Sequence, residues 1–210
     1  MTFFKLFASP PRKLLSVSLV ALLSALPQPG QAASLDTAAD LLRNYHYQEA
    51  LQATLAAPAD GRRNLLAGKL ALRLKQYDEA VSLLTAAEGS YPLLADIATA
   101  LKAEALFGRR QFREAAASAA DAAGRTPNLA LKRRMEKLAA DALFEAGDSK
   151  AALTAYRQFS SRYSLGKDSI HALYRTGRCQ EALGLLPAAV QAYRTIYQQH
   201  PASDEADKVL

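Results

Sequence analysis

The side chains best suited to chemistry in this chain are three histidines and one cysteine, and they stand far apart. His46, His171 and His200 show no metal-ligand spacing, so we expect surface or turn residues. Cys179 lacks the neighbouring His and orienting group that a catalytic thiol needs, which indicates a small buried residue. The carboxylates are dispersed, and neither a glycine-rich phosphate loop nor a His-Glu-x-x-His pattern occurs. We therefore expect no enzyme, no cofactor and no metal site.

The first 32 residues have the features of a secretory signal. Lys5, Arg12 and Lys13 precede an apolar run, 14–26, and small residues then allow cleavage after Ala32. Such a run rises about 20 Å as a helix, which is shorter than a bilayer core of about 30 Å. We expect a cleaved signal peptide at 1–32, no membrane anchor afterwards, because no cysteine follows the cleavage point, and a periplasmic location.

Half of the chain's positive net charge belongs to that signal. The net charge is +6, and removal of residues 1–32, which hold three cations and no carboxylate, leaves +3. Cations and carboxylates are interspersed over the rest. This pattern gives no reason to expect nucleic acid as a partner.

A small residue recurs through the mature chain at a nearly constant interval. The alanines of this row are 30, 35, 37 and 37 residues apart, and they are Ala50, Ala80, Ala115, Ala152 and Ala189. Apolar residues recur at helical spacing between them, clusters of Gly, Pro, Ser and Asn separate the units, and shorter breaks divide each unit in two. We predict an all-α, right-handed superhelical solenoid of about five antiparallel helix pairs over 33–210.

The best-preserved unit resembles the tetratricopeptide repeat. Apolar, small, small, aromatic and terminating-proline positions of that family are matched by Leu173, Gly177, Ala189, Tyr193 and Pro201. The first unit matches least well, as an N-terminal cap can. The resemblance implies the fold and says little of function, since this scaffold takes many partners.

In solenoids of this type the first helix of each pair lines the inner surface. The repeat register then places a mostly basic or aromatic set in the groove: Arg62, Lys69, Arg134, Lys137, His171, Tyr174 and Arg178. Such side chains suit an acidic peptide, or the carboxylates of a cell-wall stem peptide, through charge-assisted hydrogen bonds. The alternative is an ordinary solvated helix face.

Two further expectations concern the later second helices and the end of the chain. Two stripes of large side chains should pack in the core and between repeats, namely Tyr156, Phe159 and Tyr163, and Tyr193, Ile196 and Tyr197. Residues 204–210 resemble the opening of another helix with Ser203 as its N-cap. The chain is then either the front part of a longer protein, or helix 203–210 is a short cap.

The run from Ala188 to Leu210 resembles two exported families. One is the N-terminal helical superdomain of soluble lytic murein transglycosylases, whose catalytic Glu-Ser motif has no counterpart here. The other is the group of free-standing periplasmic tetratricopeptide adapters of cell division and outer-membrane assembly. Either resemblance implies a non-catalytic scaffold whose partner is a protein, a peptide or peptidoglycan. Irregular repeats and a signal without a lipoprotein cysteine favour the first.

Overall fold

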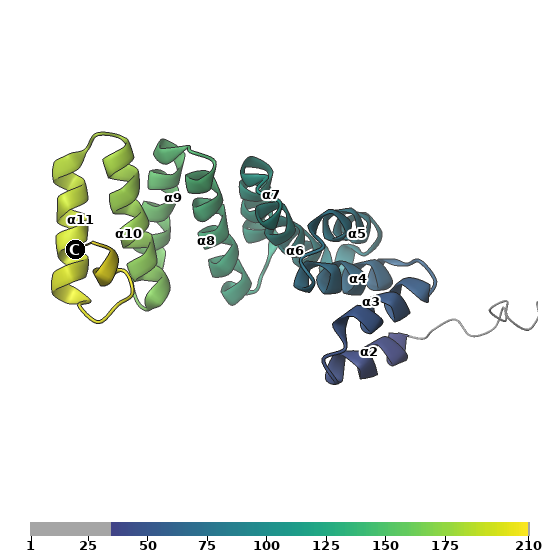
Figure 1. The fold of residues 1–210 in the computed structure, drawn as a ribbon. Coiled ribbons are helices and arrows are strands. Elements are labelled where there is room, and N and C mark those ends of the chain that lie inside the picture. Colours follow the sequence, from purple (N-terminus) through teal and green to yellow (C-terminus); the bar gives the residue numbers. More distant parts are fainter. Residues whose placement is uncertain (1–34, 210) are drawn as a thin grey trace, which may run out of the picture. The chain divides into compact units, whose positions relative to one another are not determined.

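The computed structural model describes residues 35–209, and the predicted signal peptide at 1–32 lies outside this range. The described residues are helical, with no strand, and most of them lie in ten α-helices (Figure 1). These are α2 (Leu35–Arg43), α3 (Tyr47–Ala56), α4 (Gly61–Arg73), α5 (Tyr77–Ser90), α6 (Ala95–Gly108), α7 (Phe112–Arg125), α8 (Leu129–Glu145), α9 (Ser149–Arg162), α10 (Lys167–Ala182) and α11 (Leu186–Gln199). Two short 3-10 helices, η1 (Pro92–Leu94) and η2 (Ala206–Lys208), complete the set.

Consecutive helices form five antiparallel pairs, from α2–α3 to α10–α11 (Figure 1). Each second helix also packs against the first helix of the following pair, and the first helices α4, α6, α8 and α10 contact one another in turn. The predicted all-α solenoid of five helix pairs is confirmed. The longer intervals come from the helices themselves, because α8 has 17 residues and α10 has 16, against 13 in α4.

The recurring alanine lies where the two helices of a pair meet. All five alanines of the row are at most 2% exposed. A glycine opposite the second helix serves the same close approach in two pairs. A Cβ on Gly68 would lie 2.6 Å from Cγ of Leu84, and one on Gly177 would overlap the ring of Tyr193. Larger residues at these positions would push the helices apart.

The turn between the two helices of a pair has the same form in all five pairs, with one residue in the left-handed backbone conformation. Its central residue has a positive φ, 60° at Lys75 and 64° at Arg110, and Tyr45, Gly147 and Gly184 occupy the equivalent place. The next N–H then bonds back to the helix end, as in the 2.9 Å bond from Gln76 N to the carbonyl of Ala71. This is the Schellman arrangement, and it ends the first helix sharply.

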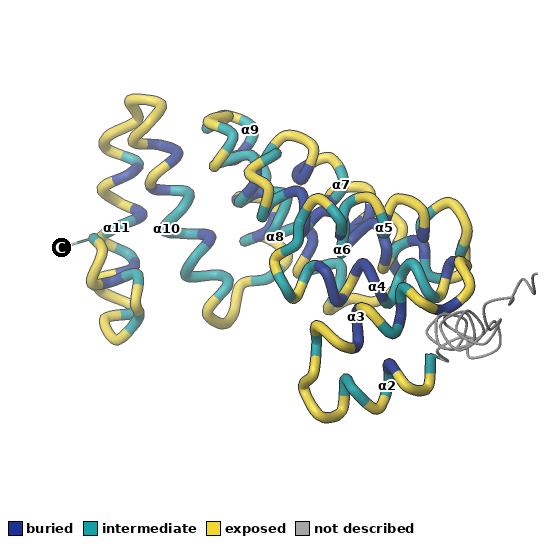
Figure 2. Tube along the Cα trace, turned by 45° about the vertical axis from the view of Figure 1, so that its right-hand side comes forward, coloured by how far each residue is buried: buried dark blue, intermediate teal, exposed yellow. Residues whose placement is uncertain are grey.

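Buried positions occur along each of the helices α2 to α11 (Figure 2). The predicted stripes of large side chains are buried or half-buried, with one exception. Tyr156, Phe159 and Ile196 are fully buried or nearly so, as predicted. Tyr197 is 53% exposed, so the expectation that it packs in the core is wrong. Ile196 holds the place that Phe159 holds 37 residues earlier, and the following residue therefore points outward.

The end of the chain differs from the expected helix. Within the described residues, 204–209 contain only the 3-10 turn η2, so the α-helix predicted there is wrong. Ser203 does act at its start, because its hydroxyl accepts the N–H of Ala206 at 3.2 Å. Ala206 is buried, while Glu205 and Lys208 reach side chains of α10. These contacts favour a compact turn over an extended helix.

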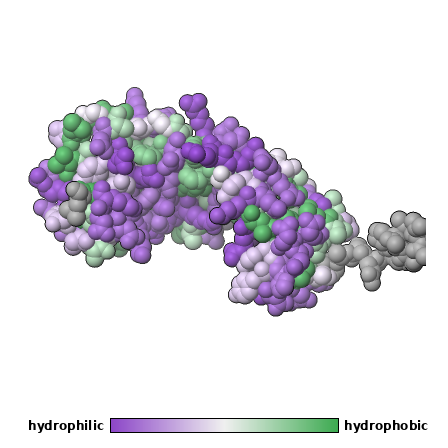
Figure 3. Space-filling view, in the orientation of Figure 1, coloured by the Kyte–Doolittle hydropathy of each residue, from purple (hydrophilic) through white to green (hydrophobic). Residues whose placement is uncertain are grey.

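The outer face of α11 carries exposed apolar side chains, visible over the beginning of that helix in Figure 3. Val190 is 52% exposed, whereas Leu153, which stands 37 residues earlier on α9, is 6% exposed. The difference arises because α10 packs against α9. None of the helices in the range 35–209 is long and apolar enough to cross a membrane.

Candidate functional site

The predicted groove residues lie on three of the first helices, namely α4, α8 and α10. Arg62 and Lys69 belong to α4, and the other five belong to α8 and α10. Arg62 is exposed and 3.4 Å from Asp60, and no ion pair within residues 35–209 engages Lys69. No hydrogen bond or ion pair within residues 35–209 joins either residue to the rest of the set. The structure thus brings Lys137 and His171 together, places Tyr174 beside Arg178, and leaves the α4 cations apart.

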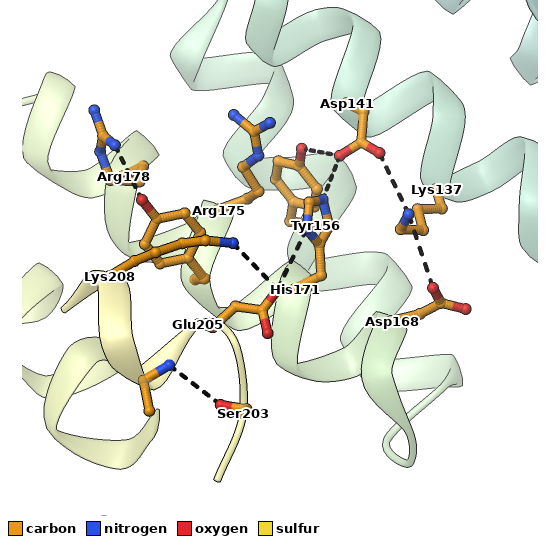
Figure 4. Close-up of polar contacts among 12 residues, drawn as sticks. Lys137, Asp141, Tyr156, Asp168, His171, Arg175, Arg178, Ser203, Glu205 and Lys208 are labelled. Atoms are coloured by element: carbon orange, nitrogen blue, oxygen red, sulfur yellow. Dashed lines mark hydrogen bonds and ion pairs between the residues drawn. The ribbon is translucent and has the colours of Figure 1, made fainter. Parts of the chain in front are cut away.

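Two of these five residues, Lys137 on α8 and His171 on α10, meet around one carboxylate, Asp141. Its Oδ1 lies 2.8 Å from Nε2 of His171 and accepts a 2.6 Å hydrogen bond from the hydroxyl of Tyr156 (Figure 4). Lys137 Nζ lies 3.7 Å from Oδ2 of Asp141 and 3.8 Å from Oδ1 of Asp168. These five residues, which we name the Asp141 network, tie α8, α9 and α10 together.

The environment of Asp141 favours its charged form. Burial alone would raise its pKa, but the hydrogen bonds from His171 and Tyr156 and the charges of His171 and Lys137 outweigh burial, so the pKa lies below its ordinary value. For Tyr156, burial and the adjacent Asp141 carboxylate both raise the pKa well above the ordinary range. Asp141 is therefore an acceptor and Tyr156 a donor over the whole physiological range.

The C-terminal turn around η2 contacts α10, the helix that carries His171. Nδ1 of His171 lies 3.9 Å from Oε1 of Glu205, and Lys208 Nζ lies 5.6 Å from the ring centre of Tyr174 (Figure 4). Arg178 donates a 3.1 Å hydrogen bond to the hydroxyl of Tyr174. Glu205 and Lys208 thus already contact part of the aromatic and basic set predicted on α10.

Two carboxylates on the same face were missed from the sequence. Glu104 and Asp141 each follow the small residue of their first helix, just as Lys69 follows Gly68. Arg134, although 60% exposed, forms an ion pair with Glu104. The repeat register could have revealed both acids, because it assigns them the position that Lys69 holds. The face around α8 therefore carries both signs of charge.

Burial dominates the titration of Glu104. It raises the pKa of this carboxyl above the ordinary value, and the charge of Arg134 only partly opposes the effect. A hollow of about 570 Å³ opens beside the pair on the first-helix face, and its polar lining is Glu104, Arg133, Arg134, Lys137, Asp141 and Asp168. Such a lining can accept and donate hydrogen bonds and can pair with either charge.

The remaining candidates for chemistry do not converge. His46 lies in a turn, as expected, whereas His171 lies inside α10 with its side chain 24% exposed, so the surface-or-turn expectation does not hold for it. Cys179 is buried, as predicted, and burial raises the pKa of its thiol to about 11. Among the described residues no group of three His, Cys, Asp or Glu side chains could hold a metal ion.

Comparison with known proteins agrees with this geometry. Residues 137–204 match the family model of the tetratricopeptide repeat. The matched segment begins within α8, ends just before η2 and contains all five residues of the Asp141 network. No curated protein matches the sequence significantly.

Several solved structures share the tetratricopeptide-like solenoid. MamA from Desulfovibrio magneticus RS-1 has a TM-score of 0.69 at 16% identity, over 83% of this chain and 98% of that one. YrrB has a TM-score of 0.67 at 16% identity, over 83% and 88%. PilW has a TM-score of 0.66 at 23% identity, over 91% and 87%. At such identities the likeness establishes the fold alone, that of a tetratricopeptide-like helical solenoid.

Proposed function

We propose that this chain is an exported adapter that holds a peptide segment of a partner protein on its first-helix face. The observation that carries the proposal is the mixed-charge hollow beside Arg134 and Glu104, which lies on that face between α6, α8 and α10. The charged side chains that pair with one another in this hollow can instead pair with the charges and amide groups of a peptide. Arg62 and Lys69 add cations on α4 for acidic side chains of the same segment.

Two of the similar structures support this choice of partner. YrrB is described as a TPR protein with an unusual peptide-binding site, and PilW as a widely conserved type IV pilus biogenesis factor. Proteins built on tetratricopeptide repeats are typically non-catalytic scaffolds. Export rests on the signal-like residues 1–32. The murein transglycosylase alternative rests on the resemblance of the run 188–210, on the irregular repeats and on the signal without a lipoprotein cysteine, but none of the similar structures supports it, so we favour the adapter.

Site-specific photo-crosslinking in intact cells tests the proposal. A crosslinking amino acid at position 69 or 134 should yield an adduct with a protein partner, whereas one at Lys150, exposed on α9, should not. The R134E/R178E double variant should abolish the adduct from position 69 while keeping the helical circular dichroism. Cell fractionation should recover the chain in the periplasm, beginning at Ala33.

The opposite results are equally clear. Equal adducts from positions 134 and 150 would show that the first-helix face is not the binding surface. Adducts that survive the double charge reversal would exclude the cations. Co-sedimentation of the purified chain with murein sacculi, with no protein adduct, would favour the wall-binding alternative.

A further inference from the structure

A second hollow, larger than that beside Arg134, lies on the other side of α8. It has a volume of about 830 Å³ and runs between the second helices α7 and α9, with α8 between them. Its apolar lining includes Ala116, Ala120, Leu143 and Phe159. This size lies within the range of pockets that take side chains or small ligands. None of the predicted groove residues lines it.

The repeat register explains why the hollow opens here. One row of the second helices, with members four residues apart, lines the hollow from α7 and can be compared at the equivalent positions of α5 and α9. The row reads Val81, Thr85, Gly89 on α5; Ala116, Ala120, Gly124 on α7; and Leu153, Arg157, Ser161 on α9. Only α7 has no atom beyond Cβ in the row. The missing side-chain volume leaves the space between α7 and α9.

Gly124 stands at the end of the α7 row and leaves space there, although neither its backbone conformation nor its neighbours require glycine. A Cβ built on it would meet nothing within 4 Å, and its φ is not positive. Glycine inside a helix costs about 0.5–1 kcal/mol relative to alanine. Within the described chain, no packing contact compensates for this cost. Small residues on one helix face are what a second helix needs for a close approach.

The charges around the hollow are mainly positive. Arg113, Lys132 and Arg162 line it together with a single carboxylate, Glu136. Glu136 is engaged by Arg162. No ion pair within residues 35–209 involves Arg113 or Lys132. An apolar base with two free cations at its edges is complementary to an acidic, amphipathic segment.

We propose that the hollow between α7 and α9 binds an acidic amphipathic helix of another protein. The apolar stripe of that helix packs on Ala120, Leu143 and Ala155, which are exposed or half-buried in the lining, and its carboxylates pair with Arg113 and Lys132. A helix fits better than an extended strand, because the small row runs along α7 and the described residues offer no sheet edge. The site is separate from the first-helix face.

Binding of a synthetic helix to the purified mature chain tests this assignment. The probe is a capped, fluorescein-labelled peptide of about 20 residues, with Leu at helical spacing and Glu on both flanks. Its affinity is measured by anisotropy. The A120L variant fills the hollow at an exposed position and should weaken binding about tenfold or more. The control is T85L, the same change at the equivalent exposed position of α5.

Two further comparisons test separately how charge and shape contribute to probe binding. R113E/K132E should abolish binding of the acidic probe, and a probe with Lys in place of Glu should bind that variant better than the original chain. G124A should raise the melting temperature but weaken binding of the probe. G89A, the same change at the equivalent position of α5, should raise the melting temperature and leave probe binding unchanged. R134E/R178E, on the first-helix face, should leave probe binding unchanged.

The proposal is overturned if the acidic probe does not bind, or if A120L and T85L act alike. It is also overturned if light scattering shows a dimer that A120L converts to a monomer, because the occupant would then be a second copy of the chain. These outcomes are independent of the crosslinking from α4 and α8.

Discussion

His171 on α10 reaches back to Asp141 on α8, with 2.8 Å between Nε2 and Oδ1. One interval of 37 residues earlier, Arg134 on α8 reaches back to Glu104 on α6 in the same way. The same register position thus carries a cationic or imidazole group on one first helix and its acidic partner on the preceding one. Polar bridges of this kind fix successive repeats beside each other in a stack whose core is mostly alanine.

Replacement of Asp141 by Asn should destabilise the chain by about 1–3 kcal/mol, since the charged contacts with His171 and Lys137 are lost. The pKa of Asp141 is lowered on folding, so its stabilising contribution is present above the ordinary carboxyl pKa and is lost as the pH falls through the lowered value. Urea unfolding between about pH 3 and pH 7 measures this effect. The variant should lose less stability across the acidic range; an unchanged pH profile would refute the assignment. Y156F, which keeps the carboxylate charge, is the matched control.

Replacement of Gly177 by Ala should cost about 1–3 kcal/mol, because the new Cβ overlaps the ring of Tyr193. G89A makes the same chemical change where the Cβ meets nothing, and should gain about 0.5–1 kcal/mol. Thermal unfolding compares the two. The Y193A background should remove most of the cost of G177A, since the two residues are in contact. Equal costs of G177A in both backgrounds would contradict the overlap.

Glycine at Lys75 or Arg110 should stabilise the protein. A left-handed backbone costs a non-glycine residue about 1–2 kcal/mol, and glycine avoids this cost but loses more freedom on folding, so the net gain is about 0.5–1 kcal/mol. Both side chains are exposed, so little packing is lost. Chemical unfolding of K75G and R110G measures the gain, with K75A as the control without it. A loss of stability in K75G would show that the turn is not strained.

The same substitution on α9 and α11 should have different effects. Leu153→Ala removes a side chain covered by α10 and should cost about 2–3 kcal/mol. Val190→Ala stands one repeat later, half exposed, and should cost less than about 0.5 kcal/mol. Urea midpoints of the two variants decide the matter. Similar losses would mean that Val190 is covered in solution.

The sequence was sufficient for the architecture. Local signals carry it: Ala152 and Ala189 mark the close contact within a pair, and Gly147 and Gly184 mark the left-handed turns, so the breaks between helices fell where they were expected. The lack of a neighbouring His and orienting group assigned Cys179 to the interior, where the structure has it. Helix periodicity and turn chemistry depend on neighbours along the chain, and a single sequence contains them.

Only the tertiary structure decided how the charges pair and where space remains. Lys137 and His171 were recognised as facing one surface, but Asp141 was not assigned to the same cluster, because its partners come from three helices. The hollow beside Ala120 depends on side chains missing from α7 and on the distance to α9. Register predicts which face a residue occupies, but the partner and the remaining volume depend on contacts between helices distant in sequence, which no local pattern contains.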